Sequence, residues 1–352
     1  MDIVITIITA VVVLSFLVFI HEGGHYLAAR FFKVRVTEFM LGLPGPSVGI
    51  KRNGTRFGIT AIPLGGYANV CGMAPKPENP LFKQVMGFSY ERGIVSYEDV
   101  ALAFDVSNQE AFELLEGLVD WGSLERATKK EGRNTYFVPE RDGMPRGCAY
   151  EVNDLDAFFQ EEAKQQYCFL PIWKRLIILF AGPGMNLLYV FLAFILIYSV
   201  VGVDVQNTAT GEITHQTLNP LDSIAAGFYV IGITFQAILN LFNPATAAET
   251  VSQSTSIIGI AVLSGDALEL GLINLVFFSA LISISLGLMN LLPIPPLDGG
   301  RILMELIQVV IRRNISLRVQ GYLSTAGFVL FMMFFLVLVN QDIQRFVFGN
   351  WG

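Results

Sequence analysis

The stretch "VVVLSFLVFIHEGGHYLAAR", residues 11–30, places two histidines and a glutamate at the end of an apolar run long enough to enter a membrane. The chain contains three histidines, and two of them, His21 and His25, stand four residues apart here. Residues four apart project from one face of a helix, so both imidazoles can reach one metal ion, and Glu22 is placed to take a proton from water. The alternative is a pair of interfacial histidines at a helix end. Because ionisable groups at membrane depth are costly and usually functional, we favour a metal site.

The composition around this stretch indicates an integral membrane protein. Of 352 residues, 53% are hydrophobic and only 15% are charged, a balance unlike that of soluble domains. Each of four stretches without a charged residue is about the length that crosses a ~30 Å hydrocarbon layer. The first lacks a basic leader and a small-residue cleavage site, so we expect it to be a retained span. We therefore predict an α-helical polytopic membrane protein with about four transmembrane helices: Ile3–Ile20, Leu176–Val203, Gly271–Leu297 and Val319–Gln341.

The basic residues predict the orientation of these spans in the cell membrane. All 23 Lys and Arg fall in residues 30–175 or 301–345. By the positive-inside rule, the segments after the first and third spans are cytoplasmic, and the segment after the second is outside. Both termini are then extracytoplasmic. The cysteines (Cys71, Cys148 and Cys168) lie in the predicted cytoplasmic segment without metal-ligand spacing, which is typical of reduced thiols.

A further apolar stretch, Ser223–Phe242, could be counted as a fifth span. If it crossed, the next span would run outward and would place Arg301, Arg312, Arg313 and Arg318 outside. That arrangement contradicts the charge pattern. We expect an amphipathic or re-entrant element on the outer face instead.

A third metal ligand is expected in "LMNLLPIPPLDGGR", residues 288–301. Asp298 is the first charged residue after Leu270, and it falls on the same predicted membrane side as the two histidines. An Asp-Gly turn or a helix cap is the structural alternative. However, Pro293, Pro295 and Pro296 break the helix at that depth, which is tolerated only where the backbone is buried in protein or lines a polar cavity. Two imidazoles and a carboxylate suit zinc and leave a fourth position for water.

Taken together, "HEGGH" in the first span and "NLLPIPPLDGG" in the third resemble the site-2 protease family of intramembrane zinc metalloproteases. Two more stretches are similar to that family: "FAGPGMNLLYVFLAF", residues 180–194, and "STSIIGIAVLSGDALELGL", residues 254–272. The resemblance covers roughly residues 3–72 and 172–343. HExxH alone is a weak signal, whereas both motifs in separate spans of matching orientation are a strong one.

The resemblance implies a mechanism and a set of site residues. Zn²⁺ is held by His21, His25 and Asp298, and Glu22 is the general base. The substrate is a single-span membrane protein, of the anti-sigma factor or remnant signal peptide type, cleaved near the cytoplasmic face. The residues expected to bind this substrate are Asn290, Pro293, Gly182 and Asn186.

Residues 45–67, "GPSVGIKRNGTRFGITAIPLGGY", alternate in character around Asn53-Gly54, a strong hairpin-turn signal. The resemblance implies a membrane re-entrant β-hairpin here. Its strand edge would pair with a substrate segment that has unwound before cleavage. An ordinary cytoplasmic hairpin remains the alternative.

The chain departs from many bacterial relatives in two places. Residues 202–221 form only a short polar loop, so no external PDZ domain is expected. Residues 75–166 are an insertion instead. The predicted organisation is thus a first span with its hairpin (1–74), the cytoplasmic insertion (75–166), and the remaining spans (167–352).

The centre of the insertion reads as helix, turn, helix and hairpin, and resembles a winged helix. Residues 91–164 contain 17 acidic and 8 basic residues, so the net charge is −9. The second helix, Asn108–Val119, has three glutamates and no basic residue, and Lys129, Lys130 and Arg133 in the predicted wing are too few to compensate. Because DNA binding requires the opposite sign, nucleic acid is an improbable ligand. We expect an unidentified cytoplasmic protein partner.

Two other functions are alternatives to the protease. A non-enzymatic membrane receptor or scaffold would signal through the insertion and keep a structural metal. A metal transporter would need further strong ligands along the spans, where only hydroxyls and amides such as Ser279, Ser283, Ser285, Asn274 and Asn186 occur. His215, in the outer segment, matches no motif and is expected to be a solvated loop residue.

Overall fold

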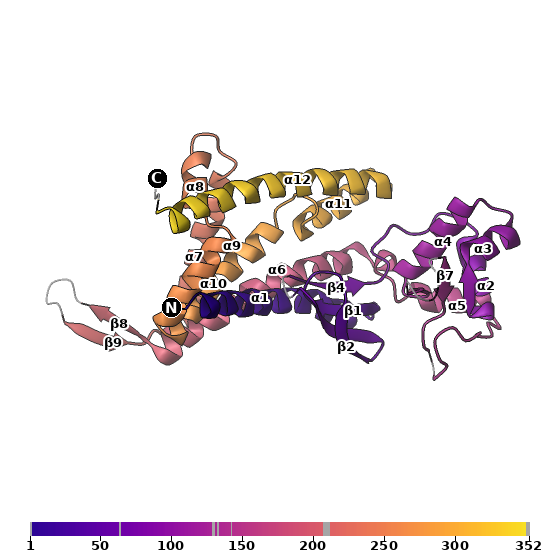
Figure 1. Cartoon of the computed structure of the whole chain (residues 1–352), viewed down its shortest axis with the longest axis horizontal. Helices are drawn as coiled ribbons and strands as arrows, with labels where there is room; N and C mark the ends of the chain where they lie inside the picture. The colour runs from indigo at the N-terminus through magenta and orange to yellow at the C-terminus, as the bar shows by residue number, and fades with distance from the viewer. Residues whose placement is uncertain are drawn as a thin grey trace.

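The computed structural model describes residues 2–62, 65–128, 131, 134–141, 143–206 and 212–349. Helices α1 (Ile3–Phe31) and α6 (Ile172–Phe194) pack side by side along the long axis of the molecule (Figure 1). The small helices and strands of residues 82–163 gather at one end of this axis. The strand pair β8 (Val203–Gln206) and β9 (Ile213–Gln216), with both chain termini, lies toward the other (Figure 1).

Helix α1 forms because an uninterrupted apolar sequence follows a good N-cap. The carboxylate of Asp2 accepts a hydrogen bond from the Val4 amide at 3.1 Å. The buried residues of α1 recur every three or four positions and form one stripe, which faces the other helices. That stripe continues into the histidines: Thr9, Ala10, Val13, Leu17, His21, Gly24, His25 and Ala29. The opposite faces are apolar and exposed, as expected of a helix in lipid.

Five helices of the described residues are long and apolar enough to cross a membrane, one more than predicted. Four of them cover the predicted spans, including the first. The extra candidate is α7. The five ranges are Ile3–Phe31, Ile172–Val201, Pro220–Asn240, Leu272–Asn290 and Arg318–Phe346. The second range joins α6 to a short π-helical segment, Ile195–Val201, and the fourth and fifth contain α10 (Leu272–Asn290) and α12 (Leu317–Asp342).

Helix α7 (Pro220–Asn240) is one continuous helix, and it covers most of the stretch expected to be an amphipathic or re-entrant element. Near its start, Ser223 Oγ lies 2.7 Å from the Oγ atom of Ser199, in the π-helical segment that follows α6. Its end leads through α8 (Ala247–Gln253) to Ser256, whose amide donates to Asp342 at the end of α12. The start of α7 thus contacts the segment that follows α6, and the residue that caps α9 (Ile257–Glu269) contacts the end of α12.

Four strands form a sheet beside α1, in the order β2-β3-β1-β4. Strands β2 and β3 make the predicted hairpin, with Asn53 and Gly54 both at positive φ in its turn. Strand β1 then pairs in parallel with β3 and antiparallel with β4, so β4 forms one edge of the sheet. The strands are β1 (Val36–Leu41), β2 (Ser47–Arg52), β3 (Thr55–Thr60) and β4 (Gly66–Val70).

The insertion has a hydrophobic core of its own, which includes Tyr90, Leu115, Leu118 and Trp121. The predicted pair of helices and the strands of a hairpin are present, and Gly122, at positive φ, follows the second helix as expected. Lys129, Lys130 and Arg133 lie outside the described residues. The elements are α2 (Phe82–Arg92), β5 (Ile94–Ser96), α3 (Tyr97–Phe104), α4 (Asn108–Asp120), β6 (Glu125–Arg126), β7 (Thr135–Phe137) and α5 (Leu155–Ala163), with the strands in the order β5-β7-β6.

A buried ionic cluster fastens the insertion to the membrane core. Glu162, fully buried on α5, accepts two hydrogen bonds from Arg35, at 2.9 and 3.0 Å. Arg141 and Ser123 donate to the same carboxylate at 2.6 and 2.8 Å. Because Arg35 directly precedes β1, the insertion is held against the sheet that packs on α1. The geometry satisfies the carboxylate on all sides, as a buried charge requires.

The remaining helices complete the end of the bundle that carries Asp298. α9 (Ile257–Glu269) packs on α1 and leads into α10. After α10 the chain turns through the prolines and enters α11 (Asp298–Ile311), whose first residue is Asp298. Gly327 of α12 approaches the Pro295 carbonyl so closely that no side chain fits there. α12 therefore closes over the proline turn.

Candidate metal centre

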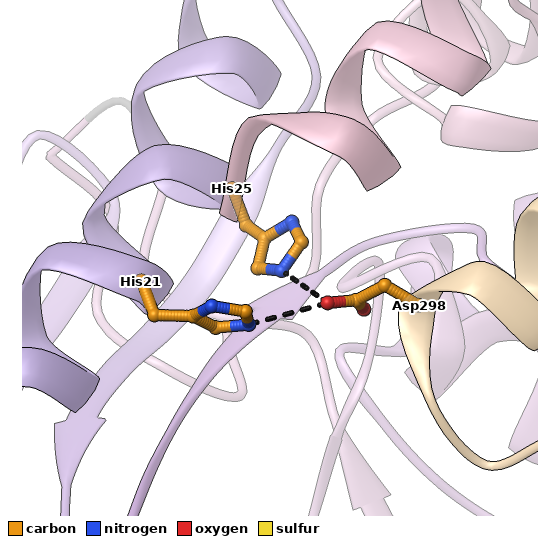
Figure 2. A group of neighbouring side chains, drawn as sticks. All are labelled: His21, His25 and Asp298. Atoms are coloured by element: carbon orange, nitrogen blue, oxygen red, sulfur yellow. Dashed lines mark ion pairs between the residues drawn. The ribbon is translucent and has the colours of Figure 1, made fainter. Parts of the chain in front are cut away.

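His21 and His25 project from one face of α1 toward Asp298 at the start of α11 (Figure 2). The Nε2 atoms of the two histidines lie 3.2 and 3.3 Å from the same oxygen, Asp298 Oδ2. Ligand atoms of all three residues fall within 4.8 Å of one another, and both histidines are buried. The three residues predicted as metal ligands are thus brought together from positions 273 residues apart.

The protonation of His25 indicates which kind of ion His21, His25 and Asp298 can bind together. Its Nδ1 lies 2.8 Å from the Ile178 carbonyl oxygen, which can only accept, so Nδ1 carries the proton. In the neutral ring Nε2 then carries an unprotonated lone pair that faces Asp298 Oδ2. The nitrogen and the carboxylate oxygen repel each other unless a cation or a proton lies between them. A charged hydrogen bond would be shorter, about 2.7–2.9 Å. Ligands placed about 2.0–2.1 Å from a tetrahedral ion lie about 3.3–3.4 Å apart, which fits Zn²⁺.

The side chain of Asn186, on α6, orients the other histidine. Its amide nitrogen lies 3.3 Å from His21 Nδ1, and its buried oxygen has no hydrogen-bond partner among the described residues. This contact holds the His21 ring in its orientation, as outer partners of metal-binding histidines commonly do.

Glycines let α1 and α6 approach each other closely at the centre. A Cβ on Gly182 would lie 2.3 Å from His25 Nε2, so any side chain there would displace the ring. A Cβ on Gly24 would lie 2.2 Å from the Ala181 carbonyl oxygen, whereas Gly23 has no atom within 4 Å. Gly24 thus provides the close contact of α1 and α6.

Glu22 faces the edge of the sheet. Its Oε2 accepts a hydrogen bond of 2.9 Å from the backbone amide of Ala68 in β4. A Cβ on Gly66 would lie 2.8 Å from Val18 Cγ1 and 3.6 Å from Glu22 Cγ, so strand β4 packs directly on α1 beside this carboxylate. The backbone amide of Ala68 and the carbonyl of Ile178 are site groups that sequence analysis missed, because main-chain atoms leave no signal in residue identity.

The four predicted substrate-binding residues occupy two different settings. Gly182 and Asn186 contact the histidines, as described above. Asn290 is the last residue of α10, partly exposed, and its side chain makes no hydrogen bond to the described residues. Pro293 follows in the exposed turn before α11. Only the second pair is therefore open to a ligand beyond the metal centre.

The hydroxyls considered as transport ligands are engaged elsewhere. Ser279 Oγ lies 2.6 Å from the Tyr189 hydroxyl, and Ser283 Oγ donates to the Asn186 carbonyl at 3.0 Å. His215 is exposed on β9 and lies 2.8 Å from Asp204 Oδ1. His215 therefore pairs with a residue of β8, and it is not part of the cluster of His21, His25 and Asp298.

Comparison with known proteins identifies the family of this chain. The family model of peptidase family M50 matches residues 9–334. The zinc metalloprotease RasP of Geobacillus kaustophilus is 27% identical, over 97% of this chain and 98% of its own length. The zinc metalloprotease RasP of Shouchella clausii is 25% identical, over 97% and 99%. The regulator of sigma-W protease RasP of Bacillus subtilis is 23% identical, over 97% and 98%.

The match spans most of the chain and includes the helices that carry the three side chains predicted as metal ligands. An enzyme of this kind is neither a non-enzymatic receptor nor a transporter, so these two hypotheses are not retained. The chain belongs to peptidase family M50, the site-2 proteases, and is a zinc-dependent metalloprotease of the membrane.

Proposed function

We propose that this enzyme hydrolyses a peptide bond within or near the transmembrane segment of single-span membrane proteins, with Glu22 as the general base. The observation that carries the proposal is that the Nε2 atoms of His21 and His25 lie 3.2 and 3.3 Å from Asp298 Oδ2. Glu22 is adjacent, and both histidines belong to an apolar helix long enough to span a membrane. Zinc, when bound, supplies a Lewis acid that polarises a peptide carbonyl and makes water easier to deprotonate.

Glu22 would move the proton. Of its two oxygens, Oε2 is held by the Ala68 amide, and Oε1 accepts no hydrogen bond from the described residues. Oε1 can take a proton from the attacking water and return it to the leaving amide nitrogen as the peptide bond breaks. Such general acid–base assistance typically contributes ~10²–10⁴-fold to a rate. The hydrogen bond to Ala68 orients the carboxylate for both transfers.

The sheet would present the substrate. A transmembrane helix hides its peptide bonds, so a segment must unwind before cleavage and then needs partners for its backbone. β4 is an edge strand beside Glu22, and an extended segment that followed this edge would pass the metal centre. Asn290, whose side-chain amide makes no hydrogen bond within the part of the chain that the structure describes, is suited to bind the substrate backbone.

The topology and the insertion complete the proposal. Both termini would be extracytoplasmic, with the metal centre near the cytoplasmic face, and α7 would lie along the outer face rather than cross. Residues 75–166 would form a cytoplasmic module of winged-helix type. Its acidic helix α4, with Glu113 exposed and Glu116 paired to Arg126, suits a basic protein partner better than nucleic acid.

The test is cleavage of single-span reporter proteins by purified enzyme in lipid, paired with zinc analysis. Glu22→Gln should retain one zinc per chain and cleave at least 100-fold more slowly, because Gln can keep the bond to Ala68 but cannot accept a proton. Glu38→Gln, a second carboxylate change in the neighbouring strand β1, provides a control for general loss of folding. Undiminished cleavage by Glu22→Gln would show that the assigned mechanism is wrong.

A further inference from the structure

α11, which begins with Asp298, has two chemically different faces. Leu303, Leu306, Ile307 and Val310 recur at helical spacing, and all four side chains are exposed. The other face carries Met304 and Glu305, which are buried, and Gln308. A helix of 14 residues is about 21 Å long, and α11 runs alongside α12, whose Gly327 meets Pro295 just before α11 (Figure 1). Its exposed apolar face therefore runs along the direction of the spanning helices, as lipid chains do.

A cavity of about 500 Å³ lies at the far end of this helix, lined by Arg175, Arg312 and Arg313 together with Glu78, Gln308, Val309 and Asn314. Arg175 is engaged by Glu305 at 2.6 Å. Arg312 and Arg313 form no ion pair or side-chain hydrogen bond with the described residues, and Glu78 pairs with none of the three. The cavity therefore has an excess of positive charge with two uncommitted guanidinium groups.

These observations combine at one place in the fold. Arg312 and Arg313 directly follow Val310 and Ile311, whose side chains are 81% and 49% exposed. Val309, 49% exposed, lines the cavity and is adjacent to Val310 at the end of the apolar face. An acyl chain along that face therefore ends where its phosphate reaches the cavity. Guanidinium groups bind phosphate oxygens in pairs of parallel hydrogen bonds, and basic pockets beside membrane helices bind anionic headgroups. An acidic peptide would use the cavity but would leave the apolar face of α11 unexplained.

We infer that the cavity lined by Arg175, Arg312 and Arg313 binds the phosphate of an anionic phospholipid whose acyl chains lie along the exposed face of α11. The bound lipid holds the end of α11 at headgroup level. Because Asp298 is the first residue of the same helix, this anchor sets the depth of the metal centre in the bilayer. Lipid binding does not depend on proteolysis and is measured without it.

The experiment uses the full-length protein and native mass spectrometry with phosphatidylglycerol, phosphatidylcholine or inorganic phosphate as the probe. The wild type should retain phosphatidylglycerol in preference to phosphatidylcholine. Arg312→Gln/Arg313→Gln should weaken phosphatidylglycerol binding about 30-fold, since each basic residue near an anionic surface contributes roughly fivefold. Arg92→Gln/Lys164→Gln removes two exposed positive charges from the insertion and should bind like the wild type.

Arg312→Lys/Arg313→Lys keeps the charge and should retain most of the affinity, which separates phosphate binding from any loss of fold. Three results would overturn the inference: equal binding of the two phospholipids, wild-type affinity in the double Gln variant, or displacement of the lipid by low concentrations of inorganic phosphate. If the double Gln variant bound lipid normally but failed on substrates with acidic flanks, the cavity would be a peptide site instead.

Discussion

The backbone amide of Ala68 in β4 donates a 2.9 Å hydrogen bond to Glu22 Oε2 on α1. This bond joins the edge of the sheet to the residue beside both histidines predicted to bind the metal. The sheet is fastened in turn to the insertion, because Arg35, which precedes β1, is held by Glu162. The catalytic helix, the sheet and the insertion are therefore in continuous contact, and each can be perturbed separately.

Loss of the third ligand should release the metal. Asp298→Asn removes the negative charge that faces both Nε2 atoms at 3.2 and 3.3 Å. We expect zinc affinity to fall by more than the ~10–100-fold typical of an outer partner, and cleavage to stop. Elemental analysis after dialysis against a chelator measures the effect. Asp266→Asn, an exposed acidic residue on α9, is the control and should retain zinc; full zinc in Asp298→Asn would contradict the assigned centre.

A single methyl group at Gly182 should disturb the same centre. Its Cβ would lie 2.3 Å from His25 Nε2, so the ring must move from its ligand position. We expect Gly182→Ala to lower zinc retention by about 10–100-fold, like the loss of an outer partner. Gly184→Ala is the matched control on α6, because its Cβ meets only the Phe180 ring at 3.1 Å, which can turn aside. Equal zinc retention in the two variants would refute the steric role of Gly182.

Neutralising Glu162 should destabilise the insertion. This fully buried carboxylate accepts hydrogen bonds from Arg35, Arg141 and Ser123, and removal of one partner from a buried ion pair typically costs about 3–5 kcal/mol. We expect Glu162→Gln to expose residues 75–166 to limited proteolysis at lower temperature than the wild type. Glu161→Gln, the exposed neighbour, is the control. Unchanged protection in Glu162→Gln would show that the cluster does not hold the insertion in place.

The cysteines should differ in their reaction with thiol reagents. Burial raises the pKa of the Cys71 and Cys168 thiols to about 12 in each case, whereas Cys148 is exposed. A raised pKa depletes the reactive thiolate, to about one molecule in ten thousand at pH 8. Maleimide labelling of the folded protein at pH 8 should therefore modify Cys148 alone, and Cys148→Ser should abolish it. Denatured protein should label at all three positions, and rapid labelling of folded Cys71 would contradict its burial.

Sequence alone determined the parts of this protein that depend on local pattern. Apolar runs of sufficient length predicted four of the five long helices, and Asn53-Gly54 predicted the hairpin turn that the structure shows. The histidines of HExxH had to share a helical face because of the 3.6-residue period. Asp298 was predicted as the third ligand because a carboxylate at membrane depth, next to a helix broken by prolines, is costly unless it has a partner.

Only the tertiary structure decided the contacts of the site that involve backbone atoms and glycines distant in the sequence. The Ile178 carbonyl that sets the tautomer of His25, and the Ala68 amide on Glu22, are main-chain groups that any residue could supply. The clearance at Gly182 exists only because α6 crosses α1 at that point. The pairing of Glu162 with Arg35 joins residues 127 positions apart. Periodicity and composition report local burial, whereas such contacts follow from how the helices pack, and so they became visible only in the folded chain.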